Sequence, residues 1–214
     1  MIGGRGLLSS KFASLSRFSL LTASMQDALF NMTEEAPQDG PDIVIHRGEF
    51  SIVPVDIPIQ WKQYQIETQY GTFDNPRMEA WYGLTYSYSG LEFDSQPLTK
   101  ELEAIRQKAM QLSGIQYNSV LCNLYRDGQD SVAFHSDDER ELGPTPNIAS
   151  ISLGASRRFV MRTKDKTRTF ETVLNHGDML IMKGTTQQEW QHSIPKTAKP
   201  VGPRINLTYR WIFE

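Results

Sequence analysis

The second half of the chain is a series of short apolar runs separated by turn residues, and this spacing constrains the fold more than any other feature. Gly, Asp, Asn and Pro lie between the runs, as they do between neighbouring strands. A series of this kind predicts a double-sheet barrel, the jelly roll or double-stranded β-helix. The runs occupy residues 118–125, 132–135, 148–153, 158–162, 179–182 and 204–213.

One helix is expected to precede these runs. Apolar residues recur at helical spacing between Thr99, whose hydroxyl can cap a helix start, and Gly114, which can end a helix. These apolar residues are Leu102, Ile105, Ala109 and Leu112. The predicted fold class is therefore mainly β with flanking helices (α+β), built around a jelly-roll core.

The N-terminal half has a different composition. Between residues 50 and 90, prolines and glycines break short apolar or aromatic runs, which predicts a lid of hairpins. Residues 34–42 are polar and contain too few apolar side chains to fold. We therefore expect a disordered leader at 1–42, a lid with supporting strands at 43–98, and a helix plus catalytic core at 99–214.

The first residues have the composition of an organelle transit peptide. Residues 1–26 contain three basic residues and six serines, with no acid before Asp27. A disordered leader, or an upstream start preceding Met25, explains this composition equally well. Both interpretations stay open.

The whole-chain composition excludes several classes of protein. A length of 214 residues, 39% of them hydrophobic, supports one core, and a net charge of −3 argues against a polycation drawn to nucleic acid by its mean field. The single cysteine, Cys122, cannot form an internal disulfide and suits a reducing compartment. Apolar runs are shorter than the roughly 20 residues of a membrane helix. We expect a soluble, intracellular monomer, with nucleus and organelle as alternative locations.

His135 and Asp137 form a His-x-Asp triplet in a predicted strand. Residues i and i+2 of a strand point to the same side, so this imidazole and carboxylate can meet one ion. His192 is far enough away in sequence to arrive from another strand as a third ligand. Two histidines and a carboxylate leave positions open for a bidentate cosubstrate and dioxygen, as in non-haem iron(II) oxygenases. The alternatives are a surface turn and a hydrogen-bonded core histidine.

The run from Arg204 to Trp211 alternates strictly between polar and apolar residues. Inside a barrel, Arg204 and Arg210 could each present a planar fork to one end of a dicarboxylate such as 2-oxoglutarate. Six residues of extended strand place them about 20 Å apart, so their side chains must converge or the strand must bend. Asn123 and Tyr125 share one face of their strand and could add neutral hydrogen bonds. An amphipathic strand facing solvent is the alternative.

Short motifs surround these candidate ligands, and further motifs lie in the expected lid. They are Asn123-Leu-Tyr125-Arg-Asp-Gly128, His135-Ser-Asp137-Asp-Glu139, His176-Gly-Asp178, Trp190-Gln-His192, Arg204-Ile-Asn206-Leu-Thr-Tyr-Arg210, Pro76-Arg77, Trp81-Tyr82-Gly83 and Tyr86-Ser-Tyr88-Ser-Gly90. Over about residues 50 to 214 the sequence resembles the AlkB-type nucleic-acid dealkylases, most closely the animal AlkB homologues that repair DNA.

The resemblance implies an Fe(II) jelly roll beneath a nucleotide-recognition lid. Three residues are then expected to hold the iron, namely His135, Asp137 and His192. Five are expected on 2-oxoglutarate, namely Asn123, Tyr125, Arg204, Asn206 and Arg210. Arg210 also belongs to the expected catalytic set, whereas His176 and Asp178 are interpreted as turn residues.

Base recognition is also implied by the resemblance. Tyr88 and His135 would sandwich a flipped base, while Glu139, with Tyr86 nearby, would face its exocyclic nitrogen. An aromatic slot and a carboxylate both suit the positive charge of an N-methylated adenine or cytosine. Arg77 is a further candidate substrate contact. Packing of the lid and a solvated acid are the alternative roles of these side chains.

Two more segments are expected to contact nucleic acid. The resemblance further implies a hairpin that fills the gap left by a flipped base in duplex DNA, with Tyr70 as its candidate wedge and Gly71 permitting a tight tip. Packing of Tyr70 and Phe73 under the lid is the alternative. Arg157, Arg158 and Arg162 are candidate phosphate contacts in a basic stretch, although charge runs are usually solvated hairpins.

The function implied by the resemblance is oxidative demethylation of N1-methyladenine and N3-methylcytosine in single- or double-stranded DNA, with RNA as an alternative substrate. The reaction would use Fe(II), consume 2-oxoglutarate and dioxygen, and release formaldehyde. Two other functions stay open. One is a 2-oxoglutarate-dependent hydroxylase of a protein side chain or small molecule, and the other is a non-catalytic nucleic-acid-binding relative.

Overall fold

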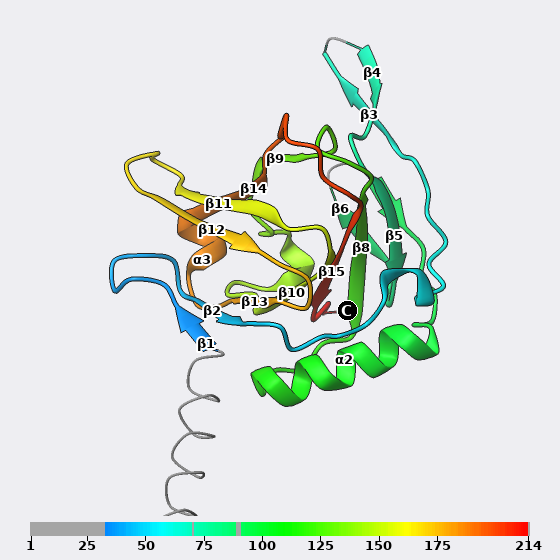
Figure 1. The fold of residues 1–214 in the computed structure, drawn as a ribbon, viewed down its shortest axis with the longest axis horizontal. Coiled ribbons are helices and arrows are strands. Elements are labelled where there is room, and N and C mark those ends of the chain that lie inside the picture. Colours follow the sequence, from blue (N-terminus) through cyan, green and yellow to red (C-terminus); the bar gives the residue numbers. More distant parts are fainter. Residues whose placement is uncertain (1–32, 70, 89–90, 214) are drawn as a thin grey trace, which may run out of the picture. The chain divides into compact units, whose positions relative to one another are not determined.

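Two antiparallel sheets pack together in the computed structural model, which describes residues 33–69, 71–88 and 91–213 (Figure 1). The larger sheet has the strand order β1 (Thr33–Glu35), β2 (Ile43–His46), β13 (Met179–Met182), β10 (Ile148–Gly154), β15 (Arg204–Arg210), β8 (Ser119–Tyr125) and β5 (Met78–Tyr82). The smaller sheet has the order β12 (Thr169–Leu174), β11 (Arg157–Thr163), β14 (Trp190–Ile194) and β9 (Val132–His135). This arrangement confirms the predicted jelly-roll core.

The remaining elements are short, apart from one helix. Two separate hairpins pair β3 (Gln65–Thr68) with β4 (Gly71–Asp74), and β6 (Tyr86–Tyr88) with β7 (Leu91–Phe93). The helices are η1 (Pro54–Asp56), α2 (Lys100–Ser113), η2 (Arg140–Leu142) and α3 (Thr186–Glu189). The two hairpins lie where a lid was expected, but β2 and β5 from the same stretch belong to the large sheet.

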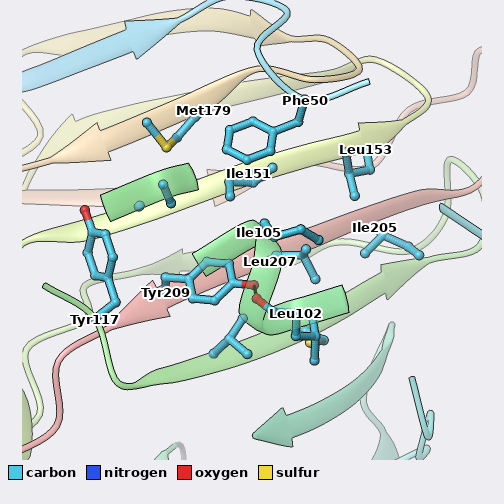
Figure 2. Close-up of a cluster of buried hydrophobic side chains, with 14 of the residues drawn as sticks. Phe50, Leu102, Ile105, Tyr117, Ile151, Leu153, Met179, Ile205, Leu207 and Tyr209 are labelled. Atoms are coloured by element: carbon cyan, nitrogen blue, oxygen red, sulfur yellow. Dashed lines mark hydrogen bonds between the residues drawn. The ribbon is translucent and has the colours of Figure 1, made fainter. Parts of the chain in front are cut away.

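Helix α2 forms where the sequence predicts it, because its ends are chemically marked. The Thr99 hydroxyl accepts a hydrogen bond from the Leu102 amide at 3.3 Å, and Gly114 ends the helix in the left-handed region with φ 70°. The apolar residues Leu102, Ile105 and Ala109 are buried against the large sheet. Figure 2 shows this helix face packed on the strands.

Each inner strand of the large sheet sends alternate side chains to opposite faces. On β15, Ile205, Leu207 and Tyr209 join the cluster beneath α2, and the Tyr209 hydroxyl donates to the Leu102 carbonyl at 2.7 Å (Figure 2). The intervening polar residues face the space between the two sheets, where a second apolar cluster lies. The strict alternation of the sequence is therefore explained by a sheet covered on both sides.

The structure corrects several boundaries. Residues 34–42 were expected to be too polar to fold, yet β1 includes Glu34 and Glu35, and Ala36 packs against the second cluster. An ion pair between Arg47 and Glu34, at 2.6 Å, helps to hold this segment. Strands β12 and β14 were not among the predicted runs, and β15 ends at Arg210 before the predicted limit of 213. The candidate transit peptide and Tyr70 lie outside the described residues.

Candidate metal and cosubstrate site

The three expected metal ligands come together between the sheets. His135 ends β9 and lies directly opposite His192 on β14, while Asp137 follows two residues after the end of β9. Ligand atoms of the three side chains all lie within 4.8 Å of one another. The distance between His135 Nε2 and Asp137 Oδ1 is 3.5 Å. One small ion could therefore contact all three groups.

Hydrogen bonds select which ligand atoms face the centre. The His135 Nδ1 atom donates to the Ala133 carbonyl at 2.9 Å, which leaves Nε2 as the inward atom. The Asp137 Oδ2 atom accepts from Arg210 at 2.8 Å, while the buried Oδ1 atom has no hydrogen-bond partner among the described residues. Buried His192 Nδ1 likewise has none. A buried carboxylate oxygen without a partner is costly, so Asp137 Oδ1 fits a metal ligand.

The electrostatics of the site favour the metal-binding forms of two ligands. Burial by itself raises the pKa of Asp137, but the interaction of its carboxylate with the Arg210 cation, together with its interactions with the two histidines, outweighs burial and holds the pKa below its usual range. Burial lowers the pKa of His192 to about 3, and proximity to His135 acts in the same direction. A carboxylate and a neutral imidazole are the forms that bind divalent metals.

Helix α3 positions Asp137, a role that no local sequence pattern predicts. The Gln187 side chain is buried and its Oε1 atom accepts a hydrogen bond from the Asp137 amide at 2.9 Å. The Ser136 hydroxyl donates to the Trp190 carbonyl, also at 2.9 Å. These bonds tie the loop after β9 to the segment that leads into His192. The prediction that His135 and Asp137 share one strand is therefore wrong: Asp137 lies in the loop after β9, and hydrogen bonds to Gln187 and Trp190 hold that loop.

The even-numbered face of β15 forms one wall of the same cavity. Arg204, Asn206, Thr208 and Arg210 all line it together with the three metal-ligand candidates. The two arginines therefore reach one cavity because their long side chains converge, while β15 keeps continuous pairing with β8 and β10. The amphipathic-surface alternative is wrong, because every residue of β15 is buried.

Arg204 has the properties of an anion ligand. Its Nη2 atom donates to the Ser152 hydroxyl at 2.8 Å, but Nε and Nη1 are buried without hydrogen-bond partners among the described residues. Burial lowers the pKa of Arg204 to about 10, and the nearby Arg157 cation contributes. A buried guanidinium with unused donors is stabilised by a carboxylate.

The other expected cosubstrate residues lie beside Arg204. Asn123 and Tyr125 project from β8 into the cavity, and the Arg204 guanidinium lies 5.2 Å from the centre of the Tyr125 ring. The Asn206 side-chain amide donates to the Ser150 hydroxyl at 2.8 Å. Ser150 and Ser152 were not predicted as site residues, although both alternate with Ala149, Ile151 and Leu153 along β10.

The residues expected to recognise the base are only partly described. The side chains of Tyr86 and Tyr88 lie outside what the structure describes, although their backbone forms β6. Glu139 is half-buried at the start of η2, with its Oε2 atom buried, and it is not among the residues lining the cavity. Arg77 does line the cavity, where it bonds Asn123.

The structure corrects the prediction that Arg157 contacts phosphate. Its side chain is buried and donates to the backbone carbonyls of Asp127, Asp130 and Pro195, at 3.0, 2.9 and 2.8 Å. Its guanidinium lies 5.6 Å from the centre of the Tyr125 ring, behind the cosubstrate wall. A buried cation that binds carbonyls of two loops, one after β8 and one after β14, has no access to a phosphate in solution.

The other two basic candidates have partners at the surface. Exposed Arg158 makes two hydrogen bonds of 2.6 Å to Glu171. The Arg162 guanidinium lies 3.7 Å from the centre of the Phe134 ring and donates to Gln191 at 3.3 Å. Both remain predictions as phosphate contacts.

The turn interpretation of His176 and Asp178 is confirmed. Buried Asp178 accepts from the Gly48 and Asn175 amides, at 3.0 and 2.9 Å, and pairs with Arg47 at 2.6 Å. The His176 Nδ1 atom accepts from the Gly154 amide at 3.0 Å. Both side chains therefore stabilise backbone turns.

This combination of a jelly roll, two histidines with one carboxylate, and a buried arginine facing them defines a class of oxygenase. The sequence pattern described as "2OG-Fe(II) oxygenase superfamily" matches residues 57–210. The chain belongs to this superfamily. Fe(II) and 2-oxoglutarate, which the family's name specifies, fit the donors observed here.

The relatives with high sequence identity belong to the AlkB group, as the motifs predicted. The chain is 42% identical over 169 residues to "Alpha-ketoglutarate-dependent dioxygenase alkB homolog 3" of Homo sapiens, covering 74% of this chain and 58% of that protein. It is 43% identical over 148 residues to "DNA oxidative demethylase ALKBH2" of Mus musculus, covering 64% and 62%. The chain thus spans less than two thirds of the length of these relatives.

A solved structure shares the fold. The protein described as "The structure of OsALKBH1" superposes with a TM-score of 0.63 at 17% identity, covering 84% of this chain and 99% of that one. Within the described residues, no helix is both long and apolar enough to cross a bilayer.

Proposed function

We propose that the chain removes N-methyl groups oxidatively from bases in nucleic acid, acting on N1-methyladenine and N3-methylcytosine in DNA, with RNA as an alternative substrate. One observation carries the proposal. A cavity joins the three metal-ligand candidates to Arg204, whose Nε and Nη1 atoms are buried without partners among the described residues. The AlkB-type relatives, whose printed names include a DNA oxidative demethylase, support the choice of substrate.

The residues of the chain supply binding and orientation. His135, Asp137 and His192 would hold Fe(II). With 2-oxoglutarate and dioxygen, the bound metal would supply the oxidation of an N-methyl group to a hydroxymethyl group, which would leave as formaldehyde, with succinate and carbon dioxide as coproducts. Arg210 pairs with the Oδ2 atom of Asp137, which leaves Oδ1 as the oxygen that would bind the metal, and Arg210 remains the proposed second ligand of 2-oxoglutarate. Arg204 would bind a carboxylate of 2-oxoglutarate through its two unused nitrogen atoms.

Substrate recognition would involve the side of the site nearest His135. The His135 side chain is 24% exposed, so one face of its ring can meet a base. Tyr88 would stack on the other face of that base, and Glu139, with Tyr86, would face the exocyclic nitrogen of a cationic methylated base. Arg77, Arg158 and Arg162 remain proposed contacts to the substrate or its phosphates.

The β3–β4 hairpin would act on duplex substrates. Thr68 pairs with Gly71 in this hairpin, and Tyr70, the proposed wedge, lies between these two positions in the sequence. Gly71 has φ 120°, a conformation that favours glycine. We further propose that the protein works as a monomer inside the cell, in the nucleus or an organelle.

A succinate-release assay tests the proposed function. Purified protein would be supplied with Fe(II), 2-oxoglutarate and one of four candidate substrates: methylated oligonucleotides, unmethylated oligonucleotides, free methylated nucleosides, or peptides. We expect succinate and formaldehyde in equal amounts with methylated oligonucleotides alone. Release driven by peptides or small molecules would instead identify a hydroxylase, and no release with any substrate would identify a non-catalytic binding protein.

A further inference from the structure

A buried series of hydrogen-bonded polar side chains leads from strand β5 to Asn123, which lines the cavity. Glu79 lies opposite Asn123 in the β5–β8 register, and its side chain is 0% exposed. Its Oε1 atom accepts from Arg77 Nη2 at 2.7 Å, and its Oε2 atom accepts from Asn75 at 2.7 Å. Arg77 Nε donates in turn to the Asn123 Oδ1 atom at 2.7 Å. Sequence analysis singled out neither Glu79 nor Asn75.

This series of hydrogen bonds determines which way the Asn123 amide points. The carbonyl oxygen of the amide accepts from Arg77, and the reverse orientation would place the Asn123 NH2 group against a second donor. The Nδ2 atom must therefore lie on the other side, and no described residue accepts a hydrogen bond from it. Asn123 lines the cavity, so a donor is available there for an anionic ligand.

Glu79 fixes Arg77 by both charge and geometry. The Arg77 guanidinium is almost fully buried, and breaking a buried ion pair from one side leaves an uncompensated charge. Asn75 closes the arrangement, because it donates to Glu79 and accepts from Arg77 Nη1 at 3.1 Å. With both Glu79 oxygens occupied, Arg77 has one orientation in which Nε meets Asn123.

We infer that Glu79 is a positioning residue for 2-oxoglutarate: through Arg77 it holds the Asn123 amide with its donor directed at the cosubstrate. The inference rests on the proposed function, in which Asn123 binds that ligand. Among these residues the Glu79 carboxylate forms hydrogen bonds with Arg77 and Asn75, and Arg77 carries its effect to the Asn123 amide.

The test measures binding without turnover. Mn(II)-loaded wild-type protein and the variants E79Q, N123A and E79Q/N123A would be titrated calorimetrically with N-oxalylglycine, a non-reacting analogue of 2-oxoglutarate. In E79Q the new NH2 group opposes a donor of Arg77 or Asn75, so we expect a loss of affinity of about tenfold. The double variant should bind no more weakly than N123A, because Glu79 acts through Asn123.

Two further variants protect the test against general loss of structure. D178N makes the same change at a buried carboxylate that binds turn residues instead of the cavity, and its affinity should stay within about twofold of wild type. If E79Q does not fold, R77M/E79L removes both charges together, which buried pairs tolerate better than the loss of one. That variant should also lose about tenfold in affinity.

The outcomes distinguish failure of the positioning role of Glu79 from failure of the proposed function. Two results would overturn the inference while leaving the proposed function intact. One is wild-type affinity for N-oxalylglycine in E79Q or in R77M/E79L. The other is a loss of affinity in E79Q/N123A equal to the product of the losses in the two single variants. Unchanged binding in N123A would overturn the inference too, because Asn123 would not be a ligand. Failure of the wild-type protein to bind N-oxalylglycine would contradict the proposed function itself.

Discussion

The two faces of β15 are equally buried but chemically opposite. Ile205, Leu207 and Tyr209 pack beneath α2, where apolar contact and one hydrogen bond satisfy the side chains. On the other face, Arg204 retains buried donors without partners among the described residues. Burial alone therefore does not separate stability from function. The difference lies in whether each buried polar atom has found a partner.

This contrast has an energetic consequence. Apolar burial stabilises the fold, whereas an unsatisfied buried polar group costs free energy until a ligand binds. The α2 face should therefore determine the free energy of unfolding, and the cavity face should determine ligand affinity. Substitutions on adjacent residues of one strand can test this division.

The largest expected effect is at the metal site. Asp137→Ala should reduce turnover to background and weaken Mn(II) binding more than about 100-fold, because it removes the one anionic ligand. Metal titration and formaldehyde release would measure both effects, with circular dichroism near wild type. Turnover by this variant at the wild-type rate would remove the metal assignment.

The α2 face should respond in stability alone. Leu207→Ala should lower the free energy of unfolding by about 2 to 5 kcal/mol, since it opens a cavity in the core. Affinity for N-oxalylglycine should remain near wild type at a temperature where the variant is folded. Denaturant unfolding and calorimetry measure the two quantities, and a loss of affinity as large as that of a cavity-face variant would break the division between faces.

The cavity face should respond in affinity. Arg210→Lys should raise the apparent dissociation constant of 2-oxoglutarate about tenfold, because an ammonium group does not reproduce a planar two-point contact. The rate of succinate formation as a function of 2-oxoglutarate concentration provides the measurement. An unchanged affinity would mean that Arg210 serves Asp137 and not the cosubstrate.

A smaller effect is expected on the substrate side. Glu139→Ala should lower activity several-fold more on cationic N1-methyladenine and N3-methylcytosine than on neutral lesions, because a nearby carboxylate favours a positively charged base. Parallel assays on the two lesion classes compare these effects. Equal losses on both classes would remove the proposed role of Glu139.

The smallest effect is expected at the hairpin and only on one form of DNA. Tyr70→Ala should lower activity on methylated duplex DNA several-fold and leave single-stranded DNA nearly unchanged, since only the duplex loses a stacking partner when the base flips. The ratio of the two rates is the measured quantity. A ratio equal to that of wild type would favour packing within the lid as the role of Tyr70.

The sequence predicted those parts of the site that repeat with the period of a strand. Asn123 with Tyr125, and Arg204 with Asn206 and Arg210, each lie on one face because alternate residues share a side. Helix α2 was equally accessible, because Thr99 and Gly114 mark its ends.

Tertiary partners were not accessible in the same way. Gln187 holds Asp137 across 50 positions of sequence, and Glu79 reaches Asn123 through Arg77, so no local pattern indicates either role. For Arg157 the sequence suggested a role that the structure contradicts. Its position in a basic run suggested a surface contact, but three backbone carbonyls satisfy its guanidinium inside the protein.

A crystal structure of the protein with Mn(II) and N-oxalylglycine would show directly whether the buried donors of β15 bind the cosubstrate. We expect one metal bound to His135, Asp137 and His192, and an analogue carboxylate within hydrogen-bond distance of Arg204 Nε and Nη1. The Asn123 Nδ2 atom should also donate to the analogue. An analogue bound away from the cavity face of β15, with the Arg204 donors still unsatisfied, would contradict this expectation.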